Sequence, residues 1–308
     1  MNLMSVTGPV ETDAISLADA HNHLWIAPAA DAEAGAPALM DFAQRLAELK
    51  VFRESAARNQ PAGCVQFDCQ PGGFGRDARM LRAMSEESGV TIVCCTGYHL
   101  RKYGPSHWLW TASAADAAAH FIRELSTGVD ESPPETPIRA GFIKIAFEQD
   151  PHSTPPALIA AVGAAVQATG CAVEVHTERG MAAEQILPLL VSHGIPADRI
   201  VLCHMDKRRD LALHRDLIAA GALLEYDTFT RTGKYGSPFP FWSQAFGAGM
   251  EDGIAIATDM AEARSEEAGE ALARLRAVMA EQAVAGREAI QKATCRNIVQ
   301  RLALRKAL

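Results

Sequence analysis

Residues that can bind metals or move protons stand at the ends of several short apolar runs in this 308-residue sequence. His21 and His23 lie two residues apart in the first of these runs. Because side chains alternate along a strand, both imidazoles would point the same way and could hold one ion together. The other runs contribute one group each: Lys144 between isoleucines, His176, His204 and Asp259. The set therefore favours a metal site.

Each of these residues also has a structural interpretation. A single histidine at the end of a strand is more often a hydrogen-bonded core residue than a ligand. Lys144 could extend its ammonium group to water, and Asp259 could cap a following helix. The conjunction favours the metal interpretation, because groups of these types recur at the same strand-end register in several runs, where an isolated buried polar group would be costly.

The runs that carry these groups alternate with segments rich in Ala, Leu, Glu and Arg at helical spacing, which is typical of repeated strand and helix units. Eight strands are predicted, at residues 16–23, 64–68, 91–97, 141–147, 172–176, 200–204, 222–227 and 254–259. Helices are predicted at residues 40–58, 77–87, 114–125, 155–168, 181–192, 211–219 and 266–281. Since no break in composition separates two halves, the expected fold is α/β, a single (β/α)8 barrel over residues 1–308 with the polar groups at its C-terminal mouth.

Composition and charge narrow the choice of partners. The formal net charge is −8, and no block of lysine and arginine stands out, which argues against a nucleic acid or an anionic membrane. A small-molecule substrate is therefore expected. The seven cysteines are odd in number and unlike a secreted disulfide framework, so they predict a reduced, cytoplasmic protein.

The whole series resembles the phosphotriesterase-like family of the amidohydrolase superfamily, and the resemblance extends over essentially the entire chain. Besides the His-x-His, Lys, His, His and Asp series, it rests on Gly-Arg-Asp at 75–77, Thr-Gly-Tyr at 96–98 and Glu-Tyr-Asp-Thr-Phe at 225–229. Near the C-terminus, Asn297 is followed by isoleucine where the family often has proline. The motifs are specific as an ensemble, although each is short.

This resemblance implies a binuclear metal centre, usually zinc, with manganese or cobalt as alternatives. By position, the ligands would be His21, His23 and Asp259 for the more buried metal and His176 and His204 for the more exposed one. Lys144, carboxylated by carbon dioxide, would bridge the two metals. That role agrees with electrostatics, because an ammonium beside two divalent cations would be repelled, whereas a carbamate supplies two oxygens and a negative charge.

The chemistry that such a centre implies is hydrolysis. A bridging hydroxide would attack a carbonyl or phosphoryl centre, and Asp259 would take its proton and return it to the leaving oxygen. The resemblance is nearest to family members that open phosphorylated sugar lactones, so a lactonase for a small anionic sugar lactone is expected. A phosphotriesterase, or a hydrolase of neutral lactones or esters, is the alternative within the same chemistry. Outside hydrolysis, the candidates are a non-catalytic barrel that binds metal and a small ligand, and a metal-dependent carbon-carbon lyase.

The segment 224–235 carries the resemblance to sugar lactonases. In those relatives a Lys-Tyr pair in this loop and an arginine after the last strand receive the substrate phosphate; Lys234 and Tyr235 match the pair, and Arg264 is the candidate arginine. The loop departs from the pattern, because Gly-Ser-Pro follows the tyrosine where Pro-Asp is usual, and the arginine spacing is stretched. Solvated loop charges are the alternative interpretation. Tyr98 is a further candidate for substrate contact, and family members are often dimers, which suggests a homodimer.

Overall fold

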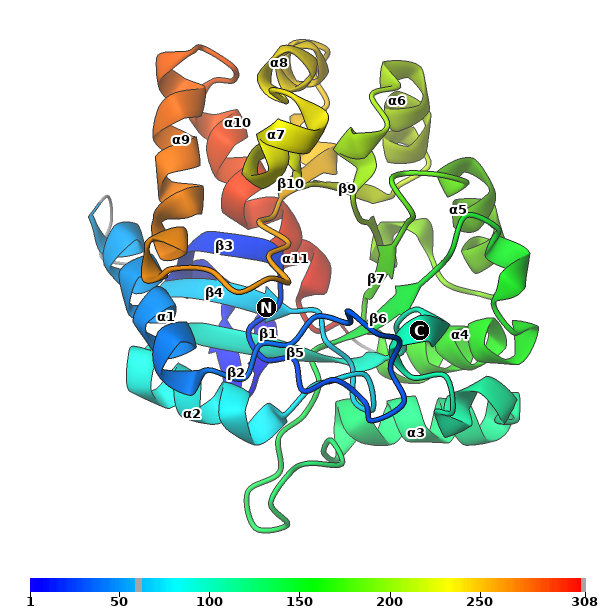
Figure 1. Ribbon diagram of the computed structural model, residues 1–308. Coiled ribbons are helices and arrows are strands. Elements are labelled where there is room, and N and C mark those ends of the chain that lie inside the picture. Colours follow the sequence, from blue (N-terminus) through cyan, green and yellow to red (C-terminus); the bar gives the residue numbers. More distant parts are fainter. Residues whose placement is uncertain (59–62, 306–308) are drawn as a thin grey trace.

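The computed structural model describes residues 1–58 and 63–305. Its centre is a sheet of eight parallel strands in sequential order, with helices between successive strands (Figure 1). The strands are β3 (Ile15–Asn22), β4 (Gly63–Asp68), β5 (Thr91–Gly97), β6 (Phe142–Ala146), β7 (Val173–His176), β8 (Ile200–Leu202), β9 (Leu223–Tyr226) and β10 (Ile254–Ile256). The predicted α/β barrel is confirmed.

Contacts between β3 and the segment after β10 close the barrel. The backbone N–H of Asp259 donates to the carbonyl of His21 at 2.8 Å. The carboxylate of Asp19 accepts hydrogen bonds from the backbone N–H of Thr258 at 2.9 Å and from its hydroxyl at 2.6 Å. Burial raises the pKa of Asp19 to about 7. These bonds place the ends of the first and last barrel strands side by side at the mouth.

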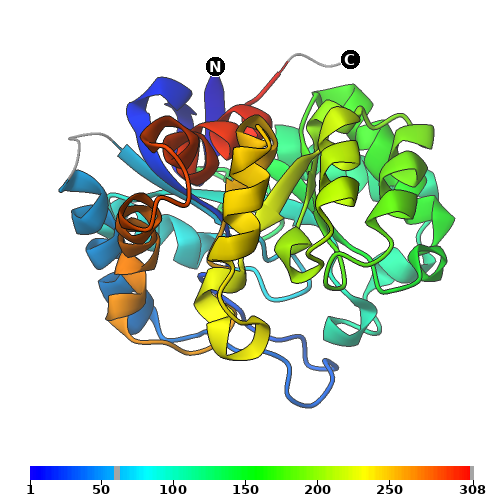
Figure 2. The ribbon, with the colours of Figure 1, turned by 90° about the horizontal axis from the view of Figure 1, so that it is seen from above.

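Helices surround the barrel, as Figures 1 and 2 show. They are α1 (Phe42–Ala57), α2 (Ala78–Ser88), α3 (Ala114–Ser126), α4 (Pro156–Thr169), α5 (Ala183–Ser192), α6 (Leu211–Ala219), α7 (Thr232–Tyr235), α8 (Phe239–Gly247) and α9 (Ala271–Glu281). Asp77 caps the first turn of α2, which ends at left-handed Gly89, so local sequence sets both ends of that helix. None of the helices in the described ranges is both long and apolar enough to cross a membrane.

Side chains alternate between the two faces of each strand, so they belong to two separate hydrophobic cores. Phe142 of β6 belongs to the core inside the barrel, whereas Ile143 and Ile145 belong to the core between strands and helices. By the same parity Lys144 points into the barrel, where it meets Glu174 of β7. Both side chains are fully buried. The barrel interior below the mouth is therefore partly polar, and its polar groups must satisfy one another.

Several helices and strands that were not predicted from the sequence cover the end of the barrel opposite the mouth. A hairpin of β1 (Asn2–Ser5) and β2 (Gly8–Glu11) precedes β3. After α9 the chain forms α10 (Arg287–Gln291), a π-helical segment (Lys292–Arg296) and α11 (Asn297–Leu302). Leu3, Ile298 and Leu302 from these elements join the core inside the barrel. This packing closes the barrel at one end, so that the polar mouth at the other end is the accessible one.

Candidate active site

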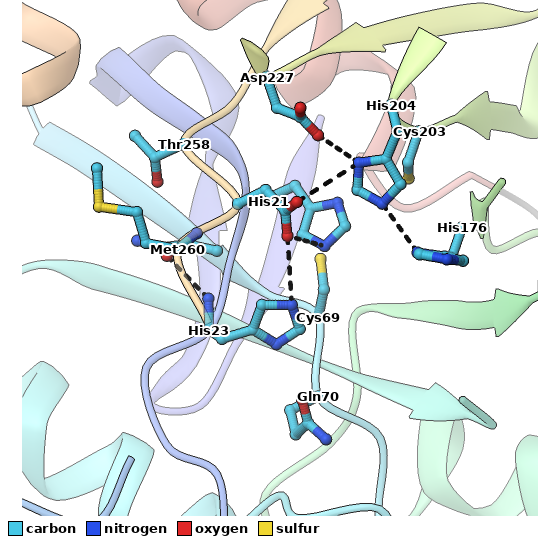
Figure 3. A network of polar contacts seen from close by, with 12 residues as sticks. His21, His23, Cys69, Gln70, His176, Cys203, His204, Asp227, Thr258 and Met260 are labelled. Carbon is cyan, nitrogen blue, oxygen red and sulfur yellow. Dashed lines mark hydrogen bonds and ion pairs between the residues drawn. The ribbon is translucent and has the colours of Figure 1, made fainter. Parts of the chain in front are cut away.

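The predicted ligands come together at the mouth of the barrel, and all except Lys144, which is in the middle of β6, stand at the end of a strand or just after it. His21 is on β3, His23 follows it, Lys144 is on β6, His176 ends β7, His204 follows β8 and Asp259 follows β10. Asp259 Oδ1 lies 3.5 Å from His21 Nε2 and 3.6 Å from His23 Nε2. Asp259 Oδ2 lies 3.6 Å from His204 Nδ1, and His204 Nε2 lies 2.9 Å from His176 Nδ1. Figure 3 shows His21 in the middle of this group, with His176 beyond His204.

Two residues of the cluster have an unusual backbone. The φ angle is +66° at His204 and +45° at Asp259. A left-handed φ costs a residue other than glycine on the order of 1–3 kcal/mol, and such positions concentrate at functional sites. Each of the two follows a three-residue strand, so the left-handed turn ends the strand and directs the side chain into the cluster.

The donor set fits a divalent metal. His23 Nδ1 and His176 Nε2 are buried and have no hydrogen-bond partner in the described part of the chain. Donor atoms of His21, His204 and Asp259 lie within 4.8 Å of one another. Burial lowers the pKa of His21 and of His204 well below the usual value, so both imidazoles are neutral, which is the form that binds metals. A metal ion would satisfy these buried atoms.

Buried carboxylates orient His204 from behind. Asp227 Oδ2 is hydrogen-bonded to His204 Nδ1, and Glu225 Oε2 accepts from the backbone N–H of His204 at 2.9 Å. Asp206 in turn accepts from the backbone N–H of Asp227 at 3.0 Å and from Trp242 Nε1 at 3.1 Å. Burial raises the pKa of Asp206. Such contacts fix the ring of a histidine and raise its strength as a ligand.

Lys144 lies at the floor of the cluster. Its Nζ is 3.1 Å from Glu174 Oε1 and 3.4 Å from His21 Nδ1. The ammonium group is thus paired with a buried carboxylate in this structure. Carboxylation of Lys144, which the family resemblance implies, would replace this ion pair with a negatively charged group.

A cavity of about 180 Å³ opens over the cluster. Five of the predicted ligands line it, namely His21, His23, His176, His204 and Asp259. The loop after β3 contributes apolar lining residues, Ile26, Pro28, Ala32, Ala36 and Pro37. A substrate held here would therefore contact both the polar cluster and an apolar wall.

The predicted substrate-binding residues do not line this cavity. Arg264 is held elsewhere, because its Nε lies 2.8 Å from Glu48 Oε1 and its Nη2 donates to the carbonyl of His23 at 3.1 Å. Lys234 is exposed, with its Nζ 5.4 Å from the ring centre of Tyr235. Tyr98 is fully buried and packs against Trp110 in the helix-facing core, with ring centres 5.8 Å apart.

The cations that do line the cavity are Lys207 and Arg231, which were not among the predicted residues. Arg231 Nη2 lies 2.8 Å from Asp259 Oδ2, and Lys207 Nζ lies 3.1 Å from Asp227 Oδ2. A signal was present in the sequence, because Lys207 follows His204 by three residues and Arg231 follows Asp227 by four. Spacing from the strand ends therefore marks both as candidates, although it does not tell which loop charges turn toward the cavity.

Arg264 and Lys234 should differ in their effect on stability. Replacing Arg264 by alanine removes a guanidinium whose side chain is 9% exposed and leaves Glu48 and two backbone carbonyls short of donors. We expect the free energy of unfolding to fall by about 2–3 kcal/mol, and Lys234→Ala to change it by less than about 0.5 kcal/mol. Urea unfolding of both variants measures this. Unchanged stability of Arg264→Ala together with weakened substrate binding would restore its role as a phosphate anchor.

The barrel and the histidine, lysine and aspartate cluster at its mouth define the class of the protein as a (β/α)8 barrel with a candidate metal centre. The sequence model of the phosphotriesterase family matches residues 1–281. The chain belongs to the phosphotriesterase family, as its motifs predicted.

Curated relatives are similar over part of their length. The chain is 28% identical over 164 residues to the phosphotriesterase homology protein of Escherichia coli K12, and the match covers 53% of this chain and 54% of that protein. It is 24% identical over 237 residues to the phospho-furanose lactonase of Mycoplasmopsis synoviae, which covers 72% of this chain and 65% of that protein. The chain thus spans about half to two thirds of the length of these relatives.

Solved structures share the fold. A lactonase from Listeria monocytogenes has a TM-score of 0.84 at 19% identity, with 99% of this chain and 100% of that chain covered. An amidohydrolase from Mycoplasma synoviae has a TM-score of 0.84 at 20% identity, with 100% and 94% covered. Because the sequence identities are only 19% and 20%, these similarities show a shared fold and nothing further.

Proposed function

We propose that this protein is a binuclear metal-dependent lactonase that opens a small phosphorylated sugar lactone. The observation that carries the proposal is the cluster of four histidines and Asp259 that lines a cavity of about 180 Å³, with Lys144 beneath it. A cavity of this size suits one small ring. The relative named phospho-furanose lactonase supports the substrate class.

The cluster divides into two sets of donors in this proposal. The ligands would be His21, His23 and Asp259 for the more buried metal and His176 and His204 for the other, with Lys144 as a carbamate completing both sets. When bound, the two metals would lower the pKa of a water held between them and polarise the substrate carbonyl. Nitrogen and oxygen donors of this kind suit zinc, with manganese and cobalt as alternatives.

Asp259 is the proposed proton acceptor. Its Oδ2 lies 2.8 Å from Arg231 Nη2 and 3.6 Å from Lys207 Nζ. These cations keep the carboxylate ionised, so Oδ2 carries no proton of its own and is available as an acceptor. In this proposal it takes a proton from the attacking water and passes it to the ring oxygen as the lactone opens. Asp227 keeps the ring of His204 in place while this happens.

In this proposal Lys207 and Arg231 also attract an anionic substituent of the substrate. Both side chains line the cavity, and a guanidinium and an ammonium group suit the oxygens of a phosphate. In this proposal the two cations take the role that the family resemblance assigned to Lys234 and Arg264.

A substrate panel tests the proposed function. We expect the zinc-loaded protein to open a phosphorylated γ-lactone with a kcat/KM about tenfold or more above that for the neutral γ-lactone, because a charge-assisted contact is lost in the neutral compound. Removal of metal by a chelator should abolish turnover, and zinc with bicarbonate should restore it. Proton release and identification of the ring-opened acid are the measurements. Two bound metals without hydrolysis of lactones, esters or phosphotriesters would indicate a binding protein, and an aldehyde or carbon dioxide product would indicate a lyase.

The second candidate is a hydrolase of neutral lactones or esters. The observation that favours it is the apolar wall formed by the loop after β3, together with Phe74. An apolar substituent packed on this wall would gain about 25 cal/mol for each Å² removed from water. The same panel separates the candidates, because the order of kcat/KM for phosphorylated and neutral lactones would be reversed.

A further inference from the structure

A fifth histidine stands beside the candidate metal ligands at the mouth of the barrel. His99 comes two residues after the end of β5 and is 8% exposed. Its ring centre lies 5.5 Å from that of His176 and 6.5 Å from that of His23, and it packs edge-on against Tyr103. His99 lines the active-site cavity, so a molecule held over the cluster would meet its ring.

One hydrogen bond determines the protonation of His99. The backbone N–H of Leu100 donates to its Nδ1 at 2.7 Å. A ring nitrogen that accepts a hydrogen bond must carry a lone pair, so the ring is neutral and its proton is on Nε2. In this form Nδ1 is already occupied and Nε2 has no lone pair to offer a metal. His99 is therefore a hydrogen-bond donor, which separates it from the four histidines of the cluster.

The proton on Nε2 is free to bind another molecule. In the described part of the chain, the bond from Leu100 is the only hydrogen bond of the His99 ring. Unlike His23 Nδ1 and His176 Nε2, the Nε2 atom of His99 is not enclosed by protein atoms. A donor that faces a cavity can be satisfied by water or by an oxygen of a ligand.

His99 and the cations of the cavity stand on opposite sides of the mouth. The barrel strands run in sequential order from β3 to β10, so β5 is the third and β9 the seventh of eight, and the two lie across from each other (Figure 1). His99 follows β5, whereas Lys207 follows β8 and Arg231 follows β9. A substrate whose phosphate lies at the two cations would therefore bring its opposite edge to His99.

The space next to His99 is also polar. Besides the active-site cavity, His99 lines a second cavity of about 240 Å³, whose walls include Arg101, Glu148 and Thr154. By contrast, the loop after β3 gives the active-site cavity an apolar wall. The edge of a substrate that faces His99 would thus lie among groups that can form hydrogen bonds, which suits hydroxyl groups.

We infer that His99 positions the substrate by donating a hydrogen bond from Nε2–H to a ring hydroxyl group of the lactone. The inference rests on the proposed lactonase function and adds that the substrate carries a free hydroxyl group on the edge of the ring away from its phosphate. No proton is transferred in this contact, so His99 takes no part in the proton transfer assigned to Asp259. A hydrogen bond between neutral groups contributes about threefold to tenfold to relative binding.

A pair of substrates and a pair of variants test this role. The substrates are a phosphorylated γ-lactone with ring hydroxyl groups and its counterpart without them. We expect the zinc-loaded wild type to prefer the hydroxylated compound by about tenfold in kcat/KM, and His99→Asn to reduce this preference to about twofold or less. Asparagine can keep the bond from Leu100, because Asn22 Oδ1 accepts from the next backbone N–H at 2.9 Å, but its amide nitrogen ends short of the Nε2 position. His99→Gln reaches that position and should restore most of the preference.

His107→Asn is the matched control. His107 is partly buried in the same connection between β5 and α3, and its Nδ1 accepts from the backbone N–H of Leu109 at 3.4 Å. It is absent from the described walls of both cavities, so its variant should keep the wild-type preference. Metal content should equal that of the wild type in every variant. An unchanged preference in His99→Asn, an equal loss for both lactones, or a loss of metal would overturn the inference.

Two further measurements separate this inference from the proposed function. Nitrogen NMR of protein with isotope-labelled histidine identifies the protonated nitrogen of His99 without a substrate, and a proton on Nδ1 would overturn the inference. Calorimetry with the corresponding γ-lactam phosphates, which resist ring opening, measures the hydroxyl preference as an affinity. If His99→Asn loses that preference but no lactone is hydrolysed by the wild type, the proposed function alone is refuted. Lactone hydrolysis that does not depend on His99 would refute the inference alone.

Discussion

Replacing Asp259 by asparagine is expected to lower kcat/KM for lactone opening by about a thousandfold, within the range of about 10²–10⁴ that positioned proton transfer contributes. Asparagine has nearly the same shape, but its amide cannot take up the proton that Oδ2 would accept. The substitution also removes the negative charge that faces His21 Nε2 and His23 Nε2 at 3.5 and 3.6 Å. Steady-state kinetics on protein of measured metal content is the required measurement.

The control for this variant is Asp252→Asn, an exposed carboxylate just before β10 that pairs with Lys292 at 2.8 Å. It makes the same chemical change at the other end of the same strand, and we expect it to leave kcat/KM unchanged. If Asp259→Asn binds two metals and turns over at the wild-type rate, Asp259 is not the proton acceptor. Loss of metal together with loss of activity would assign it to metal binding only.

The barrel could be predicted because its signals are local. Apolar runs mark the strands, so that the observed β4 (Gly63–Asp68) and β5 (Thr91–Gly97) agree with their predicted ranges to within one residue. Helix α8 (Phe239–Gly247) was not predicted, since its segment is rich in proline, glycine and aromatic residues that favour loops. Trp242 on this helix is fully buried and donates to Asp206, so tertiary contacts stabilise a helix that local propensity does not favour.

The candidate site also has a predictable and an unpredictable part. The position of a residue at a strand end determines the donors of the cluster, but it does not determine where the charged side chains of the loops lie. The donors of the cluster could be predicted because parallel strands bring their C-terminal ends to one mouth wherever the loops run. Charges in loops lack this constraint. Arg264 pairs with Glu48, which is 216 residues away in the sequence, whereas Arg231 turns toward Asp259. The folded conformation of the loops determines which carboxylate pairs with which cation, and the spacing of these residues in the sequence does not determine this pairing.

Replacing Lys144 by methionine is expected to affect both activity and stability. Methionine fills a similar volume but cannot form a carbamate, so we expect kcat/KM to fall by about a thousandfold, which corresponds to the several kcal/mol that a metal centre contributes. Bicarbonate should no longer stimulate reactivation of the metal-stripped variant. In the metal-free protein, Glu174 would lose the ammonium that lies 3.1 Å away, and the free energy of unfolding should fall by about 3–5 kcal/mol.

A double variant separates the two effects. In Lys144→Met combined with Glu174→Gln, neither member of this pair is left as an unpaired buried charge, so urea unfolding should show that most of the lost stability returns. Activity should stay low, because the amide and the thioether do not replace the carbamate. Lys50→Met on the exposed face of α1 is the control and should alter neither quantity. Recovery of activity in the double variant would show that Lys144 acts only as the partner of Glu174, and the assignment of a carbamate would then be wrong.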